Sequence, residues 1–216
     1  MISFGYKAHQ KTVIQNAIQK QKSYINDYFF PSSINKTLLV SYPHLEADDI
    51  ELVIKGLREY FHLCNIAGKT MVAMPSQVVD IAWHDFILFT REYELFCQQA
   101  LGRFLHHTPA EAMSRNTVAQ NSIKTAWKIS CEREEINPLS PKKLPLLFAL
   151  DAMLKIEDGF EYSLDCSTKN GAAYCGGHIG CSGGSGDIGS VTDGSDSSIG
   201  SSVDGSVGCG GGCGGS

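Results

Sequence analysis

The strongest constraint on the fold is an abrupt change of composition near residue 170. Of the 22 glycines, 17 lie from Gly171 onward, and the residues before them have an ordinary globular composition. A glycine-rich chain loses much conformational entropy when it folds, and the few isolated Ile and Val residues of this stretch cannot build a core. We therefore expect a helical domain over residues 1–165 and a disordered Gly/Ser/Asp/Cys-rich tail over residues 166–216.

Within the predicted domain, apolar residues recur with the 3.6-residue period of amphipathic helices. This pattern predicts a mostly α fold, a single domain of about six helices with little strand. The predicted helices span residues 11–30, 50–64, 76–89, 90–104, 108–137 and 145–156. The short apolar run 37–41 is predicted to be an extended connector.

Three helix starts are marked by local sequence. Asp48 and Asp49 would complement the positive end of the second helix dipole, and Ser76 is the expected N-cap of the third helix. Thr108-Pro109-Ala110-Glu111 combines a capping residue, a proline at the first helical position and the reciprocal Glu of a capping box. Thr90 is the expected cap of the fourth helix, and Gly68 and Gly102 are expected at helix ends.

The charge distribution argues against nucleic acid as a partner. The net charge is −5, and the stretch after Lys169 has no Lys or Arg, so the domain is almost neutral and offers no basic surface for phosphates. Four of the negative charges belong to that stretch, namely Asp187, Asp193, Asp196 and Asp204. No secretory signal and no membrane-spanning run are recognisable, so we expect a cytoplasmic protein.

In a reducing compartment, cysteines are more often free or metal-bound than paired in disulfides. Of the eight cysteines, four are dispersed through the domain and are expected to pack as small hydrophobes: Cys64, Cys97, Cys131 and Cys166. Trp83 and Trp127 are likewise expected in the core or at helix contacts.

The pair Asp80 and His84 is the most suggestive group in the domain. At a spacing of four residues their side chains share one helical face, where they could bind a metal or form an acid/base pair. A zinc site needs at least three ligands, and an antiparallel hairpin of the third and fourth helices would place Cys97 near this face. The same hairpin would set His106 and His107 about 9 Å or more along the axis from the pair. The alternative is a core histidine hydrogen-bonded to Asp80, with Cys97 a buried thiol.

The tail carries a second set of possible metal ligands. Cys175, His178 and Cys181 are each separated by two residues, and Cys209 and Cys213 add a further pair. Together they could complete a Cys/His zinc site, although closing the glycine-rich loop between the two groups costs entropy. The alternative is an unordered thiol-bearing tail.

Several short motifs resemble one known family. They are Asp80-Ile-Ala-Trp83-His84, Arg91-x-Tyr93, Phe96-Cys97, Gly102-Arg-Phe-Leu-His106-His107 and the Gly/Cys tail. By these motifs the chain resembles the glycine-rich domain-containing protein-like family of bacteria and plants, over residues 40–165. Plant members often have a histidine where this chain has Phe86. The resemblance implies an architecture and no reaction.

The sequence leaves three functions open. The first is a non-catalytic interaction or scaffold module that recognises an unknown protein partner and carries a flexible thiol-rich tail. The second is a metal-binding protein or metal-dependent enzyme that uses Asp80 and His84, with zinc as the possible ion. The third treats the tail as a substrate for post-translational modification. No Gly-x-Ser-x-Gly, P-loop or dinucleotide motif identifies catalytic residues in the domain.

Overall fold

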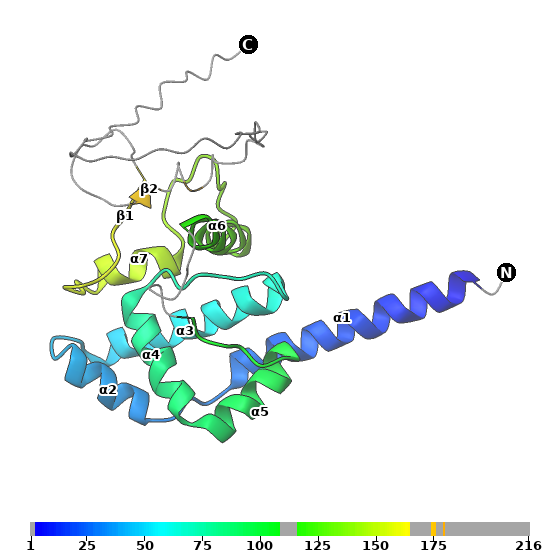
Figure 1. Cartoon of the computed structure of the whole chain (residues 1–216), viewed down its shortest axis with the longest axis horizontal. Helices are drawn as coiled ribbons and strands as arrows, with labels where there is room; N and C mark the ends of the chain where they lie inside the picture. The colour runs from blue at the N-terminus through cyan, green and yellow to red at the C-terminus, as the bar shows by residue number, and fades with distance from the viewer. Residues whose placement is uncertain (1–2, 109–115, 165–173, 176–178, 180–216) are drawn as a thin grey trace, which may run out of the picture. The chain divides into compact units, whose positions relative to one another are not determined.

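The structure is a computed structural model that describes residues 3–108, 116–164, 174–175 and 179 (Figure 1). The predicted mostly α class is confirmed, with seven helices and two very short strands in these residues. The helices are α1 (Ser3–Asp27), α2 (Ser33–Ser41), α3 (Ala47–Ala67), α4 (Gln77–Leu88), α5 (Thr90–Leu101), α6 (Asn116–Arg133) and α7 (Leu146–Met153). The strands are β1 (Tyr162–Ser163) and β2 (Tyr174–Cys175).

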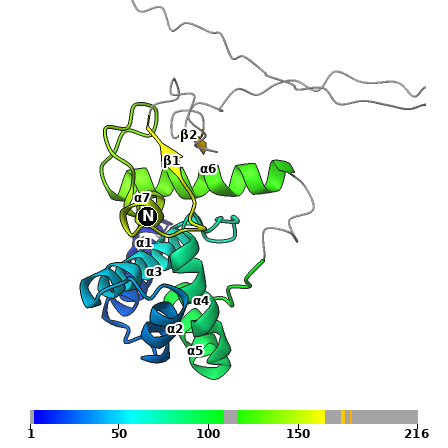
Figure 2. The same ribbon diagram turned by 90° about the vertical axis from the view of Figure 1, so that its left-hand side faces the viewer.

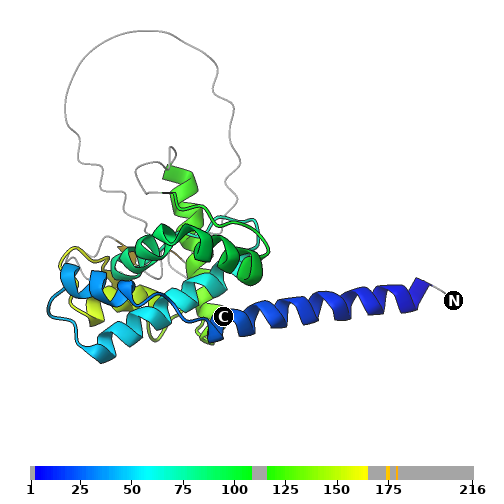
Figure 3. The same cartoon turned by 90° about the horizontal axis from the view of Figure 1, so that it is seen from below.

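Helix α3 is the centre of the packing. It contacts α1, α4, α5, α6 and α7, and Figure 2 shows α6 lying across it. The C-terminal part of α1 packs on α3 and α5 (Figure 3), where Ile25 is fully buried. Gly56 permits a close approach of α3 to its neighbours, because a Cβ there would lie 2.5 Å from Leu150 of α7 and 2.9 Å from Val79 of α4.

An aromatic cluster joins α3, α4 and α5 to the segment that follows α1. The rings of Phe61 and Phe96 lie 4.6 Å apart between centroids, and Phe86 contacts both at 6.2 and 5.3 Å. Tyr28 and Phe30, which follow α1, pack against Phe96 at 4.7 and 6.0 Å. Aromatic pairs at such separations add stability beyond the area they bury, so this cluster fixes α4 and α5 against α3.

Most predicted helix ends agree with the structure. The N-cap Ser76 accepts a hydrogen bond from the Val79 backbone N–H, and Gly68 and Gly102 terminate α3 and α5 with positive φ angles. At the start of α3, Glu46 and Asp49 form a reciprocal capping box. Thr90 is the first residue of its helix rather than the cap, which is Phe89.

The prediction of an extended connector at residues 37–41 is wrong, because this run belongs to α2. Ile34 and Leu38, four residues apart, are both fully buried, and the helix packs on α4. Ser33 and Thr37 donate hydrogen bonds of 2.7 and 3.0 Å to the two carboxylate oxygens of Asp85 in α4. Contacts distant in sequence therefore stabilise a helix too short to be evident from periodicity.

Several predicted helices extend past their observed C-terminal ends, whereas α1 begins at Ser3, before the predicted start at Lys11. Helix α1 ends at Asp27, three residues before the predicted Phe30, and α6 ends at Arg133, where Glu135 has a left-handed φ of 55°. The proposed capping box at Thr108 falls largely outside the described residues, because residues 109–115 are among those not described.

The packing continues beyond residue 165. Strand β1 pairs in parallel with β2, and Ile179 is buried against the core. The prediction of a disordered tail concerns residues that otherwise lie outside the described part. Among the described residues, no helix has the length and apolar character needed to cross a membrane.

Candidate metal centre

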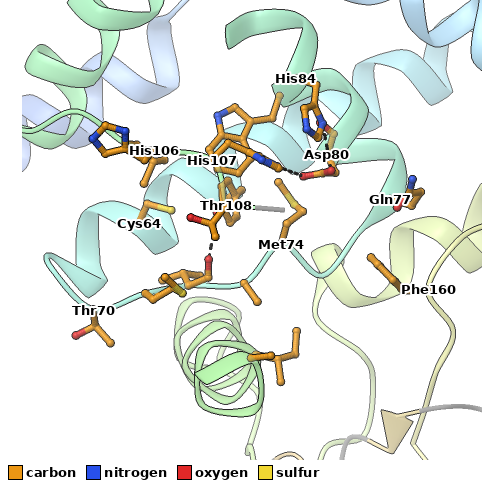
Figure 4. Close-up of a pocket in the computed structure, with 18 of the residues that line it drawn as sticks. Cys64, Thr70, Met74, Gln77, Asp80, His84, His106, His107, Thr108 and Phe160 are labelled. Carbon is orange, nitrogen blue, oxygen red and sulfur yellow. Dashed lines mark hydrogen bonds and ion pairs between the residues drawn. The ribbon is translucent and has the colours of Figure 1, made fainter. Parts of the chain in front are cut away.

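Helix α4 supplies two residues of the candidate site. Asp80 and His84 lie one turn apart, and His84 Nδ1 is 2.9 Å from the Asp80 carbonyl oxygen and 3.2 Å from its Oδ2 (Figure 4). Because a carbonyl oxygen only accepts, this contact favours the tautomer in which His84 Nδ1 carries the proton, and in the neutral ring of that tautomer Nε2 has a free lone pair. A histidine held in this way by an oxygen acceptor is typical of metal ligands.

The third residue comes from the segment 102–108, which follows α5. His107 Nε2 lies 3.0 Å from Asp80 Oδ1, and the rings of His107 and His84 lie 4.1 Å apart between centroids. Figure 4 shows the two rings on either side of the Asp80 carboxylate. A ligand atom from each of the three residues lies within 4.8 Å of the others. Among the described residues the structure thus forms an Asp80–His84–His107 cluster.

A buried hydrogen-bond relay positions the segment 102–108 over α4. Tyr93 Oη accepts a hydrogen bond of 3.1 Å from Trp83 Nε1 and donates one of 2.6 Å to the Leu105 carbonyl. The His107 ring packs on Trp83 with 4.6 Å between centroids. Because Trp83 precedes His84 in α4, the relay determines where His107 stands relative to the other two residues.

The sequence argument against His107 is therefore wrong. That argument placed the residues after α5 opposite Met74 and measured separation along a helix. After the left-handed Gly102, however, residues 104–108 have no helical structure, and extended chain advances about 3.3 Å per residue. Five such residues span enough distance to bring His107 to Asp80. His106 points away, with its ring 4.8 Å from that of Phe104 (Figure 4).

Cys97, the predicted third partner, is not part of this cluster. Its side chain is fully buried, and its thiol is in hydrogen-bonding contact with Tyr93 and the Leu105 backbone. Burial raises the pKa of the Cys97 thiol, which disfavours the thiolate needed for metal binding. Cys97 therefore behaves as the alternative interpretation expected. Cys64 and Cys131 are also free and buried, and burial raises their pKa values to about 12 and about 11.

The predicted tail ligands are not tested by the structure. Cys175 lies in β2, but its side chain is outside the described part, as are His178, Cys181, Cys209 and Cys213. A zinc site in the tail stays a prediction. Trp83 and Trp127 are 3% and 1% exposed, so the prediction that both are core residues is confirmed.

The Asp80–His84–His107 cluster opens into a cavity of about 940 Å³. The side chains of Asp80 and His107 are 21% and 15% exposed, whereas His84 at the rim is 51% exposed. Among the described residues, Asp80 is the only acidic one that lines this cavity. Two histidines and one carboxylate that leave coordination positions open are a ligand set for zinc or ferrous iron in catalytic sites. The donor set therefore fits a divalent transition-metal ion.

Fold and site together define a helical protein with an Asp/His cluster in a pocket. The chain belongs to the UCP032817-like family, whose model matches residues 20–179. That range contains all three residues of the cluster and every residue that lines the cavity. No curated protein and no solved structure matches the chain. The family match does not connect the chain to the glycine-rich domain-containing family, so that resemblance stays a prediction.

Proposed function

We propose that the protein binds one divalent transition-metal ion, zinc or ferrous iron, through Asp80, His84 and His107, and uses it in the adjoining pocket. The observation that carries the proposal is the convergence of His107 on Asp80 and His84 from a distant segment of the chain. Two of the three residues share a helix turn by necessity, whereas the third is held in place by the Tyr93 relay.

The surroundings of the cluster support this proposal. No Lys or Arg forms an ion pair with Asp80 in the described part of the chain, and its only ion-pair partners there are the two imidazoles. An ion would replace the His107–Asp80 hydrogen bond by two metal–ligand bonds and release the shared proton. With three protein ligands, a tetrahedral ion keeps one position for water or a substrate.

This chemistry assigns definite roles to the three residues. Asp80 neutralises half of the charge of the ion, and the Asp80 carbonyl orients the His84 ring. A bound divalent ion lowers the pKa of a coordinated water and polarises carbonyl or phosphoryl oxygens. The prediction of a module that binds a protein partner and the separate prediction of a tail that is modified both stay predictions.

The test is zinc binding by the full-length reduced protein, measured by calorimetry and by metal analysis after gel filtration. Because the tail cysteines could bind zinc themselves, the reference protein carries Ser in place of Cys175, Cys181, Cys209 and Cys213. We expect one equivalent of zinc in this reference protein. His107→Ala should weaken its binding at least about 100-fold, since loss of even an outer-shell partner costs about 10- to 100-fold.

The matched control is His106→Ala. His106 is the neighbouring residue of the same type, and its ring contacts Phe104 instead of Asp80. We expect it to leave zinc affinity within about twofold of the reference. Equal zinc uptake by the reference protein and His107→Ala would show that the cluster is a hydrogen-bonded structural group and no metal centre.

A further inference from the structure

The cavity beside the cluster has the size of a small-molecule site. At about 940 Å³ it lies at the upper end of the range of about 300–1,000 Å³ for ligand pockets. Its walls come from the end of α3 and the segment that follows it, from α4, from segment 102–108, from α6 and from the chain around β1. Figure 4 shows Asp80, His107, Met74 and Phe160 around the same space.

Arg103 is the feature of this cavity that the metal proposal does not use. Its side chain is partly buried, and no carboxylate lies within salt-bridge distance of it in the described residues. Its guanidinium has only long contacts with two backbone carbonyls, 3.4 Å to Cys64 and 3.5 Å to Phe104. Among the described residues, Arg103 therefore has no carboxylate partner, and it lines the cavity.

The balance of charge in the cavity favours an anion. Arg103 and the exposed Lys69 line it, and Asp80 is the only acid that the described part of the chain contributes to it. A divalent ion at Asp80 would make the net charge of these lining groups more positive. Guanidinium groups recognise carboxylate and phosphate through paired N–H donors, and such groups also occupy open positions on zinc.

The rest of the lining is largely apolar. Met71, Met74, Phe104, Ile123 and Phe160 are among the residues that line it. Methionines adapt to the shape of a ligand, and aromatic rings bury large apolar area. A fully hydrophilic ion such as sulfate would leave these walls unused, whereas an organic acid with an apolar body would cover them.

We propose that the pocket binds a small organic anion, with a carboxylate or phosphate head group shared between the metal ion and Arg103 and an apolar body against the methionine and phenylalanine walls. This inference rests on the proposed metal site, because it is the ion that supplies most of the positive charge. Arg103 is the residue that selects an acid over its neutral analogue.

The experiment uses the full-length reference protein, with Ser in place of the four tail cysteines, loaded with Co²⁺. The visible absorption of Co²⁺ reports both metal uptake and any change at the open coordination position. Three probes are titrated: phenylacetate, octanoate and phenyl phosphate. Phenylacetamide is the neutral comparison for phenylacetate. We expect at least one acid to change the spectrum saturably with Kd below about 10 mM, and the amide to have no effect at that concentration.

Arg103→Gln should weaken binding of that acid by about tenfold or more while Co²⁺ uptake is unchanged. The control is Arg91→Gln, an exposed arginine of α5 that does not line the cavity, and it should not alter the affinity. If Co²⁺ binds to the reference protein but none of the three acids changes the spectrum, or if Arg103→Gln in that protein does not weaken acid binding, the inference is wrong and the metal site stands. If Co²⁺ does not bind, both proposals fail.

Discussion

Asp151 is the residue whose replacement tests the architecture of the site most directly. This carboxylate of α7 is 3% exposed and lies at the N-terminus of α4. Its Oδ1 accepts hydrogen bonds from Ser76 Oγ at 2.7 Å and the Val78 N–H at 3.3 Å. Its Oδ2 accepts from the Gln77 N–H at 2.7 Å and the Phe160 N–H at 2.8 Å. It therefore covers two of the α4 donors that the helix itself leaves unsatisfied.

Asp151→Asn keeps the shape of the side chain and replaces one acceptor oxygen by an NH₂ donor. In one amide orientation the NH₂ faces the N–H groups of Gln77 and Phe160, and in the other it faces Ser76 and the Val78 N–H. Each hydrogen bond to a charged group contributes about 1.5–3 kcal/mol, and an orphaned buried donor costs about 1–3 kcal/mol. Losing two such bonds should lower the free energy of unfolding by about 3–5 kcal/mol.

The assay is urea unfolding of the full-length protein followed by the fluorescence of the two buried tryptophans, with thermal unfolding beside it. A loss of about 3 kcal/mol in a chain of this size corresponds to a midpoint lowered by about 6–12 °C. Asp158→Asn is the matched control, because Asp158 is an exposed carboxylate a few residues further along the chain, and its replacement should cost less than about 0.5 kcal/mol. A variant Asp151→Asn within 1 kcal/mol of the wild type would refute the view that this carboxylate anchors α4.

Three further outcomes follow from the structure. Burial lowers the pKa of His62 to about 4, below its unfolded value of about 6.5. The free energy of unfolding should therefore fall by about 2–3 kcal/mol as pH drops from about 6.5 to 4. In urea unfolding measured across this pH range, His62→Gln should remove most of that decrease. Tyr93→Phe removes the hydroxyl that links Trp83 to Leu105 and leaves the Trp83 Nε1–H and the Leu105 carbonyl unpaired. The urea midpoint should drop by an amount equivalent to about 2–3 kcal/mol. An unchanged midpoint would contradict the relay. Chelation of zinc by EDTA should leave the far-ultraviolet circular dichroism unchanged, because the cluster is already held by protein hydrogen bonds; loss of helical signal would show a folding role for the ion.

The parts of the fold that the sequence predicted well are those that depend on neighbours along the chain. Ser76 caps α4 through the Val79 N–H three residues on, and Gly68 and Gly102 end helices because they tolerate positive φ. The spacing of Asp80 and His84 predicted their contact for the same reason, since residues four apart always share a helix face.

The parts that the sequence missed depend on segments far apart in the chain. Helix α2 depends on Asp85, about 50 residues away, and the anchoring of α4 depends on Asp151, more than 70 residues away. The periodicity of apolar residues along the chain does not reveal contacts between residues so far apart in sequence. Ser33 and Thr37 are four residues apart, but this spacing alone does not predict that both donate hydrogen bonds to Asp85 on the neighbouring helix.

The third member of the cluster shows the same limit most clearly. His106 and His107 are identical neighbours, and only the path of segment 102–108 distinguishes them. That path is set by the relay from Trp83 through Tyr93 to Leu105, in which each partner is ten or twelve residues from the next along the chain. Chemically equal residues thus acquire different roles because one of them faces α4 and the other faces Phe104.

Two sets of hydrogen bonds hold the site, one at the start of α4 and one in segment 102–108. Their positions determine which part of the site can adjust to an ion. Asp151 and Ser76 fix the first turn of α4, so Asp80 and His84 are held on a helix that has little freedom to move. His107 instead stands at the end of a non-helical segment fastened two residues earlier, at Leu105. If an ion replaced the His107–Asp80 hydrogen bond as proposed, the adjustment would therefore fall on His107 and not on α4. Arg103 lies on the other side of the fastening point at Leu105, so this adjustment should leave the position of Arg103 unchanged.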